Sequence, residues 1–203
     1  MPDILIATHN SHKAMELKFF LKDSNVEIKT FSDIGYNDEV VEDGKTFEEN
    51  ALIKARVAAS LGYIGIADDS GLCVDYLKGE PGVYSARYAG EPCDDEKNND
   101  KLLDLMKDVD DEKRTAKFVS VIACVTPDGK EFCCRGECLG VIMKSRRGNG
   151  GFGYDPLFLY RELNKTFAEM NAEEKNSVSH RARAMQKFAS EFSRRFNCQS
   201  PHS

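Results

Sequence analysis

The sequence predicts an α/β fold in which helices flank a long mixed β-sheet. Apolar segments of strand length alternate with segments of helical periodicity, beginning with a strand over 4–7 and a helical pattern over 15–21. Farther along, strands over 115–125 and 131–143 are separated by the turn residues Pro127-Asp128-Gly129, which predicts an antiparallel hairpin. A hairpin added to strand–helix alternation indicates a mixed sheet rather than an all-parallel one.

The first third of the chain contains clear signals for where a strand, a loop and a helix begin and end. A second strand is expected over 26–30, and the acidic segment 33–45 after it contains glycines and is expected to be a loop. Residues 46–49 read TFEE, a capping box that predicts a helix from Phe47 to Leu61, ended by Gly62.

Two adjacent carboxylates, Asp68 and Asp69, follow an apolar strand over 64–67. Because Asp is depleted inside strands and costly to bury alone, we expect the strand to break at 68–71, with both carboxylates facing a cleft, and to resume over 72–74. A turn with local backbone hydrogen bonds and a cation or metal site are supported about equally. Aspartic proteases share an apolar run followed by D-S-G, but they are almost wholly β, whereas this chain predicts several helices.

The second half begins with a long loop over 78–92, punctuated by glycine and proline. A helix capped by Asp94 or Asp95 and running to Met106 follows, before the hairpin. The last helix has apolar residues at helical spacing, namely Met185, Phe188, Ala189, Phe192 and Phe196.

Composition excludes several classes of protein. The 203 residues carry a net charge of −6 without a basic stripe, which argues against binding a nucleic acid polymer. No apolar run approaches the length of a membrane span, and the amino terminus does not resemble a signal peptide. The odd number of cysteines, seven, fits reduced thiols. We therefore expect a cytoplasmic protein that does not bind membranes.

Residues 8–13 read THNSHK and lie between a strand and a helix. Free backbone amides at a helix start form an anion site, to which Thr8, Asn10 and Lys13 would add a hydroxyl, an amide and a charge. The segment lacks the glycines of a Walker loop, and taken alone it is better explained as a plain polar turn.

Three further features have both a plain and a functional explanation. Glu42 lies in an acidic run that is either solvated or a ligand source. Residues 148–156 read GNGGFGYDP, which is either a turn, a segment that approaches a ligand closely, or a moving lid. The cationic His180 and Arg181 stand at a helix start, where an anionic partner should offset the unfavourable helix dipole.

The motifs THNSHK, VEDGKTFEENALIKA, ADDSGLCVD, GEPGVYSARYAG, GGFGYDPLF and SHRARA, in this order, closely resemble the inosine triphosphate pyrophosphatase family. The resemblance implies one domain over 1–198 with two lobes around a central cleft, a tail over 199–203, and a homodimer. It also implies Mg²⁺-dependent hydrolysis of non-standard purine nucleoside triphosphates (ITP, dITP, XTP) to the monophosphate and pyrophosphate, which would cleanse the nucleotide pool.

The resemblance also implies roles for individual residues. It assigns the metal to Glu42 and Asp69, with Asp69 as proton acceptor, and catalysis to Asp69 with Asp68 and Lys54. Substrate contacts fall on Thr8, His9, Asn10, Ser11, His12, Lys13, Ser70, Phe152, Gly153, Tyr154, Asp155, Lys175, His180 and Arg181. His9 departs from the family pattern, in which glycine is frequent. The acids and the cations are expected to neutralise one another around the bound ligand.

The implied mechanism is attack of water on the α-phosphorus without a covalent intermediate. Phe152 is expected to stack on the base, and Arg181 to donate to the 6-keto oxygen that adenine lacks. Two alternatives remain: a nucleotide-sensing module without turnover, and a pyrophosphatase of the Maf type acting on dTTP or UTP. Retention of Glu42, Asp68 and Asp69 together favours an enzyme.

Overall fold

The computed structural model describes residues 3–21 and 27–196. The strands are β1 (Ile4–Ile6), β2 (Ile28–Thr30), β3 (Ile64–Val74), β4 (Thr115–Val125), β5 (Glu131–Ile142), β6 (Phe158–Tyr160) and β7 (Lys165–Thr166). The α-helices are α1 (Ser11–Leu21), α2 (Phe47–Ser60), α3 (Asp95–Leu105), α4 (Ala172–Val178) and α5 (His180–Phe196).

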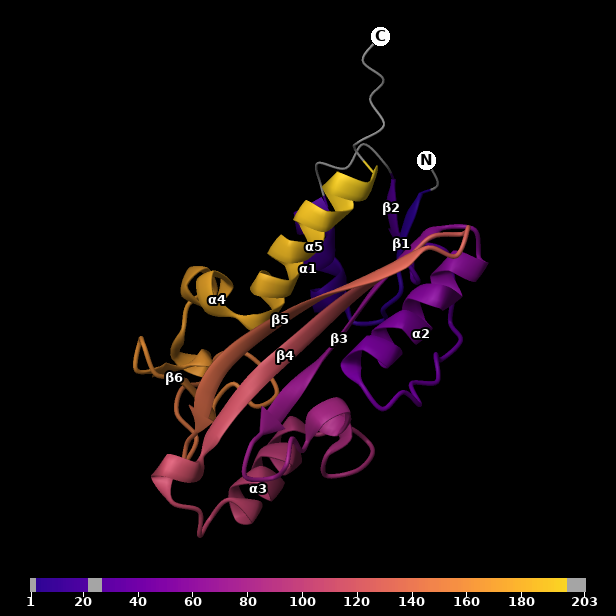
Figure 1. The fold of residues 1–203 in the computed structure, drawn as a ribbon. Helices are drawn as coiled ribbons and strands as arrows, with labels where there is room; N and C mark the ends of the chain where they lie inside the picture. Colours follow the sequence, from indigo (N-terminus) through magenta and orange to yellow (C-terminus); the bar gives the residue numbers. More distant parts are fainter. Residues whose placement is uncertain (1–2, 22–26, 197–203) are drawn as a thin grey trace. The chain divides into compact units, whose positions relative to one another are not determined.

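The strands form one sheet with the order β2-β1-β3-β4-β5-β6-β7 (Figure 1). Strand β1 runs parallel to both β2 and β3, whereas β6 runs antiparallel to β5 and β7. The predicted mixed sheet with flanking helices is therefore confirmed. No helix among the described residues has the length and apolarity needed to cross a membrane.

The chain divides into two compact units. Unit 1 comprises Met1–Asp69, Ser120–Gly136 and Arg183–Ser203, and unit 2 comprises Ser70–Val119 and Glu137–Ala182. The long strands β3, β4 and β5 contribute residues to both units, and the boundary in β3 falls between Asp69 and Ser70.

In unit 1, helices cover the two faces of the sheet (Figure 1). One face buries Ile66 of β3 against Leu17 of α1 and Met185 of α5. On the other face, α2 approaches β3 so closely that a Cβ on Gly65 would lie 2.0 Å from the carbonyl oxygen of Ala55. Gly65 therefore permits the contact that brings α2 onto β3.

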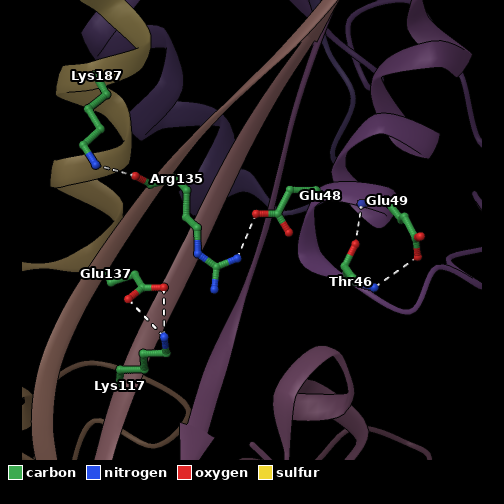
Figure 2. Close-up of polar contacts among 7 residues, drawn as sticks. All are labelled: Thr46, Glu48, Glu49, Lys117, Arg135, Glu137 and Lys187. Atoms are coloured by element: carbon green, nitrogen blue, oxygen red, sulfur yellow. Dashed lines mark hydrogen bonds and ion pairs between the residues drawn. The ribbon is translucent and has the colours of Figure 1, made fainter.

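Polar side chains tie these helices to β5. Arg135 of β5 pairs with Glu48 of α2, with 2.8 Å between Nη1 and Oε1 (Figure 2). Lys187 of α5 donates to the carbonyl oxygen of Arg135 at 2.8 Å. Arg135 thus connects β5 to helices that lie on opposite faces of the sheet.

Unit 2 has its own aromatic core. The Phe118 ring lies 4.6 Å from Phe158 and 5.5 Å from Phe167, measured between centroids. Arg114 is buried and donates to the backbone carbonyls of Ile142, Met106, Val109 and Met143. These bonds satisfy its guanidinium with backbone oxygens and fasten the chain after α3 to the end of β5.

The structure confirms several predicted helix caps, one pair of strand bounds and the buried face of the last helix. The Thr46 hydroxyl accepts from the amide of Glu49 while the Glu49 carboxylate accepts from the amide of Thr46, so α2 begins with the predicted capping box (Figure 2). Helix α3 is capped by Asp94, and β4 has the predicted bounds. Met185, Phe188 and Phe192 of α5 are buried as the helical spacing predicts.

The predicted break in β3 is wrong. The strand continues through Asp68, Asp69, Ser70 and Gly71 as eleven consecutive residues. Strand β1 pairs with β3 only as far as Ile6 opposite Ile66, so the acidic pair lies just beyond the point where β1 ends. Cationic side chains from two helices reach both carboxylates, which removes the electrostatic reason to leave the strand.

Other differences are smaller. Helix α1 begins at Ser11 rather than Met15, because the Asn10 side chain caps it by accepting from the amide of Lys13 at 3.1 Å. The loop over 78–92 contains a 3₁₀ turn, η1 (Gly82–Arg87). Strands β6 and β7 lacked a recognisable pattern, whereas helix α4, which was not predicted, begins with a capping box of Asn171 and Glu174. The predicted tail over 199–203 lies outside the described residues.

Candidate active site

The first group of predicted site residues lies in unit 1 and is called the acidic cluster: Lys13, Glu42, Lys54, Asp68 and Asp69. Lys54 of α2 places its Nζ 2.8 Å from Oε2 of Glu42 and 3.6 Å from Oδ1 of Asp69. One ammonium therefore serves two carboxylates that are far apart in the sequence. The close packing of α2 on β3 at Gly65 puts Lys54 within reach of the strand.

Asp68 has a different cationic partner. Its Oδ2 lies 3.1 Å from Nζ of Lys13, which α1 provides. Neighbouring residues of a strand point to opposite faces of the sheet, so Asp68 faces α1 and Asp69 faces α2. Each carboxylate of the acidic pair therefore has a lysine partner, and Lys54 is shared with Glu42.

Burial determines the protonation behaviour of Asp69. The side chain is 12% exposed, and this desolvation raises its pKa to about 6 although Lys54 and Lys13 act to lower it. For Lys54, burial lowers the pKa, but the charges of Asp69, Asp68 and Glu42 outweigh it and the net pKa is raised. Near neutral pH the cluster holds a firmly charged ammonium beside a carboxylate that gains and loses a proton easily.

The acidic cluster contains carboxylate oxygens of the kind that bind hard metal ions. Among the described residues, no group of three or more His, Cys, Asp or Glu side chains converges on one point. Asp69 nevertheless has a buried Oδ2 with no hydrogen-bond partner among those residues. Glu42 and Asp69 both pair with the ammonium of Lys54. Mg²⁺ commonly binds one or two protein carboxylates and takes its remaining ligands from water and phosphate. The oxygen atoms of Glu42 and Asp69 fit such a site.

The segment 8–13 forms the turn before α1. The Thr8 hydroxyl accepts from the amide of Asn10 at 3.1 Å, and Asn10 caps the helix. His9 lies with Nε2 at 3.3 Å from the carbonyl oxygen of Asp38. The side chains of Ser11 and His12 lie outside what the structure describes. The polar side chains at 8 and 10 thus have structural partners, and Lys13 is the member that faces Asp68.

The second group lies in unit 2 and is called the ring cluster: Ser70, Phe152, Asp155, Lys175 and Arg181. Phe152 is 55% exposed, with Nζ of Lys175 at 5.1 Å and Cζ of Arg181 at 5.7 Å from its ring centroid. An exposed ring that two cations approach can stack on a planar, electron-rich partner.

The backbone around this ring is held by Asp155. Its Oδ2 accepts from the amide of Phe152 at 3.0 Å and from Nζ of Lys175 at 2.5 Å. A Cβ on Gly151 would lie 2.0 Å from this oxygen, so only glycine leaves room for the carboxylate. Gly151 therefore permits close approach of the Asp155 carboxylate, and the predicted approach of this segment to a ligand stays a prediction.

Arg181 and His180 open α5 in different environments. Arg181 donates from Nη2 to the Ser70 hydroxyl at 3.3 Å. His180 is buried and stacks on Phe118, with centroids 4.8 Å apart and an interplanar angle of 14°. Arg181 thus belongs to the ring cluster, while His180 also packs in the aromatic core of unit 2.

Sequence reasoning missed two residues that hold the ring cluster, Asp95 and Asn99 of α3. Asp95 accepts from the amide of Gly153 and Asn99 donates to its carbonyl. Asp95 was considered only as a helix cap. The available signal was the pair Asn98-Asn99 inside a helix, where Asn is unfavourable unless its amide has a specific partner.

Comparisons with known proteins were made for the whole chain. The family model described as Ham1 family matches residues 4–191. A dITP/XTP pyrophosphatase of Clostridium perfringens is 50% identical over 194 residues, covering 92% of this chain and 95% of that protein. One of Geobacter sulfurreducens is 51% identical over 186 residues, covering 91% and 94%.

Solved structures agree with these relatives. The Ham1 protein of Staphylococcus aureus superposes with a TM-score of 0.89 at 40% identity, covering 95% of this chain and 99% of that one. A nucleoside-triphosphatase / dITP/XTP pyrophosphatase of Mycobacterium abscessus gives 0.81 at 45% identity, covering 92% and 98%. Sequence and fold thus agree over most of the chain, which belongs to the Ham1 family.

Proposed function

We propose that this protein hydrolyses non-standard purine nucleoside triphosphates, namely dITP, XTP and ITP, to the monophosphate and pyrophosphate. The observation that carries the proposal is the buried Asp69 carboxylate, which shares the Lys54 ammonium with Glu42 and has a pKa raised to about 6. A carboxylate whose pKa lies close to neutral pH, beside fixed cations, is suited to accept a proton from a water molecule that attacks a phosphate. The names of the curated relatives support the same reaction.

The proposed step is attack of water on the α-phosphorus. The bond from the water oxygen to phosphorus forms while the bridging bond to the β-phosphate breaks, so pyrophosphate departs with its electron pair. Asp69 accepts the proton of the water through its ionised carboxylate. No covalent enzyme intermediate is needed.

The lysines supply electrostatic stabilisation. Lys54 is buried and held charged by three carboxylates, and Lys13 is held by Asp68. Cations fixed in advance stabilise the charge that develops on phosphate oxygens without reorganising during the reaction. Thr8 and Asn10 shape the turn that carries Lys13.

We further propose Mg²⁺ as the cofactor, held by Glu42 and Asp69. The support is the hard oxygen donor set and the buried Asp69 Oδ2 without a hydrogen-bond partner among the described residues. When bound, the ion would neutralise charge on the triphosphate and on its leaving group. The ammonium of Lys54 between the two carboxylates limits their repulsion in the absence of the ion.

The ring cluster is proposed to recognise the base. Phe152 would stack on the purine, and Arg181, fixed by Ser70, would donate to the 6-keto oxygen of hypoxanthine or xanthine. Adenine has an amino group at this position and cannot accept that hydrogen bond. A site built around one hydrogen bond discriminates strongly, because a mismatched substrate leaves a polar group unpaired.

We also propose that the protein acts in the cytoplasm as a homodimer. Six cysteines of the described residues are free thiols, which suits a reducing compartment. The dimer rests on the family resemblance, and light scattering coupled to size exclusion tests it directly.

The deciding experiment measures pyrophosphate release from dITP, XTP, ITP, ATP, GTP and dTTP, with Mg²⁺ and with EDTA. We expect release from the first three substrates and its loss with EDTA. Preference for dTTP would favour the Maf-type alternative. Tight dITP binding without turnover would favour a sensing module, and either result would overturn the proposal.

A further inference from the structure

Helix α3 holds both sides of the peptide at Gly153, the residue that follows the exposed Phe152. Oδ2 of Asp95 accepts from the Gly153 amide at 2.7 Å. Nδ2 of Asn99 donates to the Gly153 carbonyl at 2.9 Å. Both contacts lie within unit 2, and they fix the orientation of this peptide from a regular helix rather than from the loop itself.

Asn99 is specialised for this contact. It is 1% exposed, and its Nδ2 also donates to the carbonyl of Asp95 at 2.9 Å. Both amide hydrogens therefore have partners, while Oδ1 is buried without one among the described residues. Burying an asparagine in this way is unfavourable for the helix alone. Its contact with Gly153 gives the residue a reason to be there.

Without these contacts the ring would be poorly fixed. Gly151 and Gly153 both have positive φ, with values of 74° and 60°, so the backbone beside Phe152 has wide conformational freedom. Asp155 holds the amide of Phe152 on one side. Asp95 and Asn99 hold the next peptide on the other, so the ring is clamped from both directions.

We propose that Asp95 and Asn99 are positioning residues for base recognition, acting through the Gly153 peptide on the ring of Phe152. The inference rests on the proposed function, in which Phe152 stacks on the purine. The two residues do not touch the substrate in this proposal. They hold the stacking surface ready before the nucleotide arrives, which lowers the entropy lost on binding.

The proposal has a kinetic signature. Losing the clamp loosens recognition of the base but leaves the acidic cluster of unit 1 unchanged. We expect Asp95→Ala to raise KM for dITP about fivefold or more. This effect corresponds to losing part of the binding affinity that base stacking on an aromatic side chain contributes. The kcat should change less than about twofold, because the groups proposed to act on the phosphate are intact.

A spectroscopic test requires no turnover. The chain contains no tryptophan, so Phe152→Trp introduces a single indole at the ring position. In this background we expect Asp95→Ala to lower the anisotropy of the indole fluorescence and to raise acrylamide quenching about twofold, because the released backbone lets the ring move. The conservative Asp95→Asn keeps an acceptor oxygen and should restore both signals. The same substitutions in the Phe152 protein provide the KM values.

A matched control exists on the same helix. Asp104 is also an exposed acid of α3, and its partner is Lys107 rather than the loop. Asp104→Ala should leave both the fluorescence and KM unchanged. Asp95 is exposed, so its substitution leaves the core intact; if Asp95→Ala nevertheless failed to fold, Asn99→Ala would be measured in the same way and would decide.

The two proposals fail differently. If Asp95→Ala matches Asp104→Ala in anisotropy, quenching and KM, the positioning role is wrong even if dITP is hydrolysed. If the unsubstituted protein does not hydrolyse dITP, the proposed function is wrong. The indole fluorescence of the Phe152→Trp variant would then still show whether Asp95 and Asn99 order the ring. If they order it but dITP is not hydrolysed, their proposed role in base recognition is wrong.

Discussion

The acidic cluster and the ring cluster position their functional side chains by different forces. In the acidic cluster, buried carboxylates meet lysines from two helices, and desolvation raises the pKa of Asp69 to about 6. In the ring cluster, an exposed Phe152 is held through its backbone by Asp155, Asp95 and Asn99. The first arrangement suits proton transfer and charge stabilisation, and the second suits recognition of a planar group.

Under the proposed function, this contrast separates the chemical step from the selection of the substrate. Changes in the acidic cluster should reduce turnover of every substrate alike. Changes in the ring cluster should alter the preference among substrates.

Asp69→Asn should lower kcat for dITP by about two powers of ten or more, because the variant lacks the proposed proton acceptor. Binding of dITP, measured by calorimetry with Ca²⁺ in place of Mg²⁺, should persist. The isosteric amide keeps the strand intact. Near-normal hydrolysis by this variant would remove Asp69 from the mechanism.

Arg181→Ala should lower kcat/KM for ITP by about 2 kcal/mol, or about thirtyfold, because a charge-assisted hydrogen bond to the 6-keto oxygen is lost. Hydrolysis of ATP should change far less, so the ratio of the two efficiencies collapses. Lys13→Ala is the control from the acidic cluster and should lower both efficiencies in proportion. An equal loss on both substrates for Arg181→Ala would contradict its role in selecting the base.

Glu42→Gln should raise the Mg²⁺ concentration for half-maximal rate by about tenfold, as expected when one oxygen ligand is weakened. The rate at saturating Mg²⁺ should fall much less. Asp43→Asn, a neighbour in the same acidic run, is the matched control. An unchanged metal titration would place Glu42 among the solvated acids of that run.

Asp69→Asn should also stabilise the metal-free protein above pH 6. The folded pKa of about 6 exceeds the ordinary value of 3.8, so the native state binds the proton more tightly and loses stability as the pH rises from 4 to 6. The amide avoids this loss, which is about 3 kcal/mol because the shift spans about two pKa units and each unit corresponds to about 1.4 kcal/mol.

Urea unfolding from pH 4 to 8 measures this difference. The gap between variant and parent should widen up to pH 6 and then stay constant. Asp33 provides a contrast, because its hydrogen bonds to Lys18 and Thr30 lower its pKa to about 2. Asp33→Asn should therefore cost stability above pH 4, and that cost should diminish as the pH falls toward 2. A gap that does not change with pH for Asp69→Asn would show that the carboxyl is not destabilised by burial.

Much of the fold could be predicted because its signals are local. The capping box of Thr46 and Glu49, the Asp94 cap and the apolar spacing of Met185, Phe188 and Phe192 each act within one turn or one helix face. Strands β6 and β7 could not be predicted, because they have only three and two residues and contain no periodicity to read.

The sequence by itself named the members of both clusters through motifs that resemble those of a known family, but it did not indicate that Asp95 and Asn99 hold the ring cluster. Only the tertiary structure decided their partners. Alternation along β3 sends Asp68 toward α1 and Asp69 toward α2, and the space left by Gly65 lets α2 bring Lys54 to the strand. These helices bring a cation to each carboxylate, and β3 continues where its composition predicts a break. The cost of burying a charge depends on what lies across the sheet, and no local pattern records that.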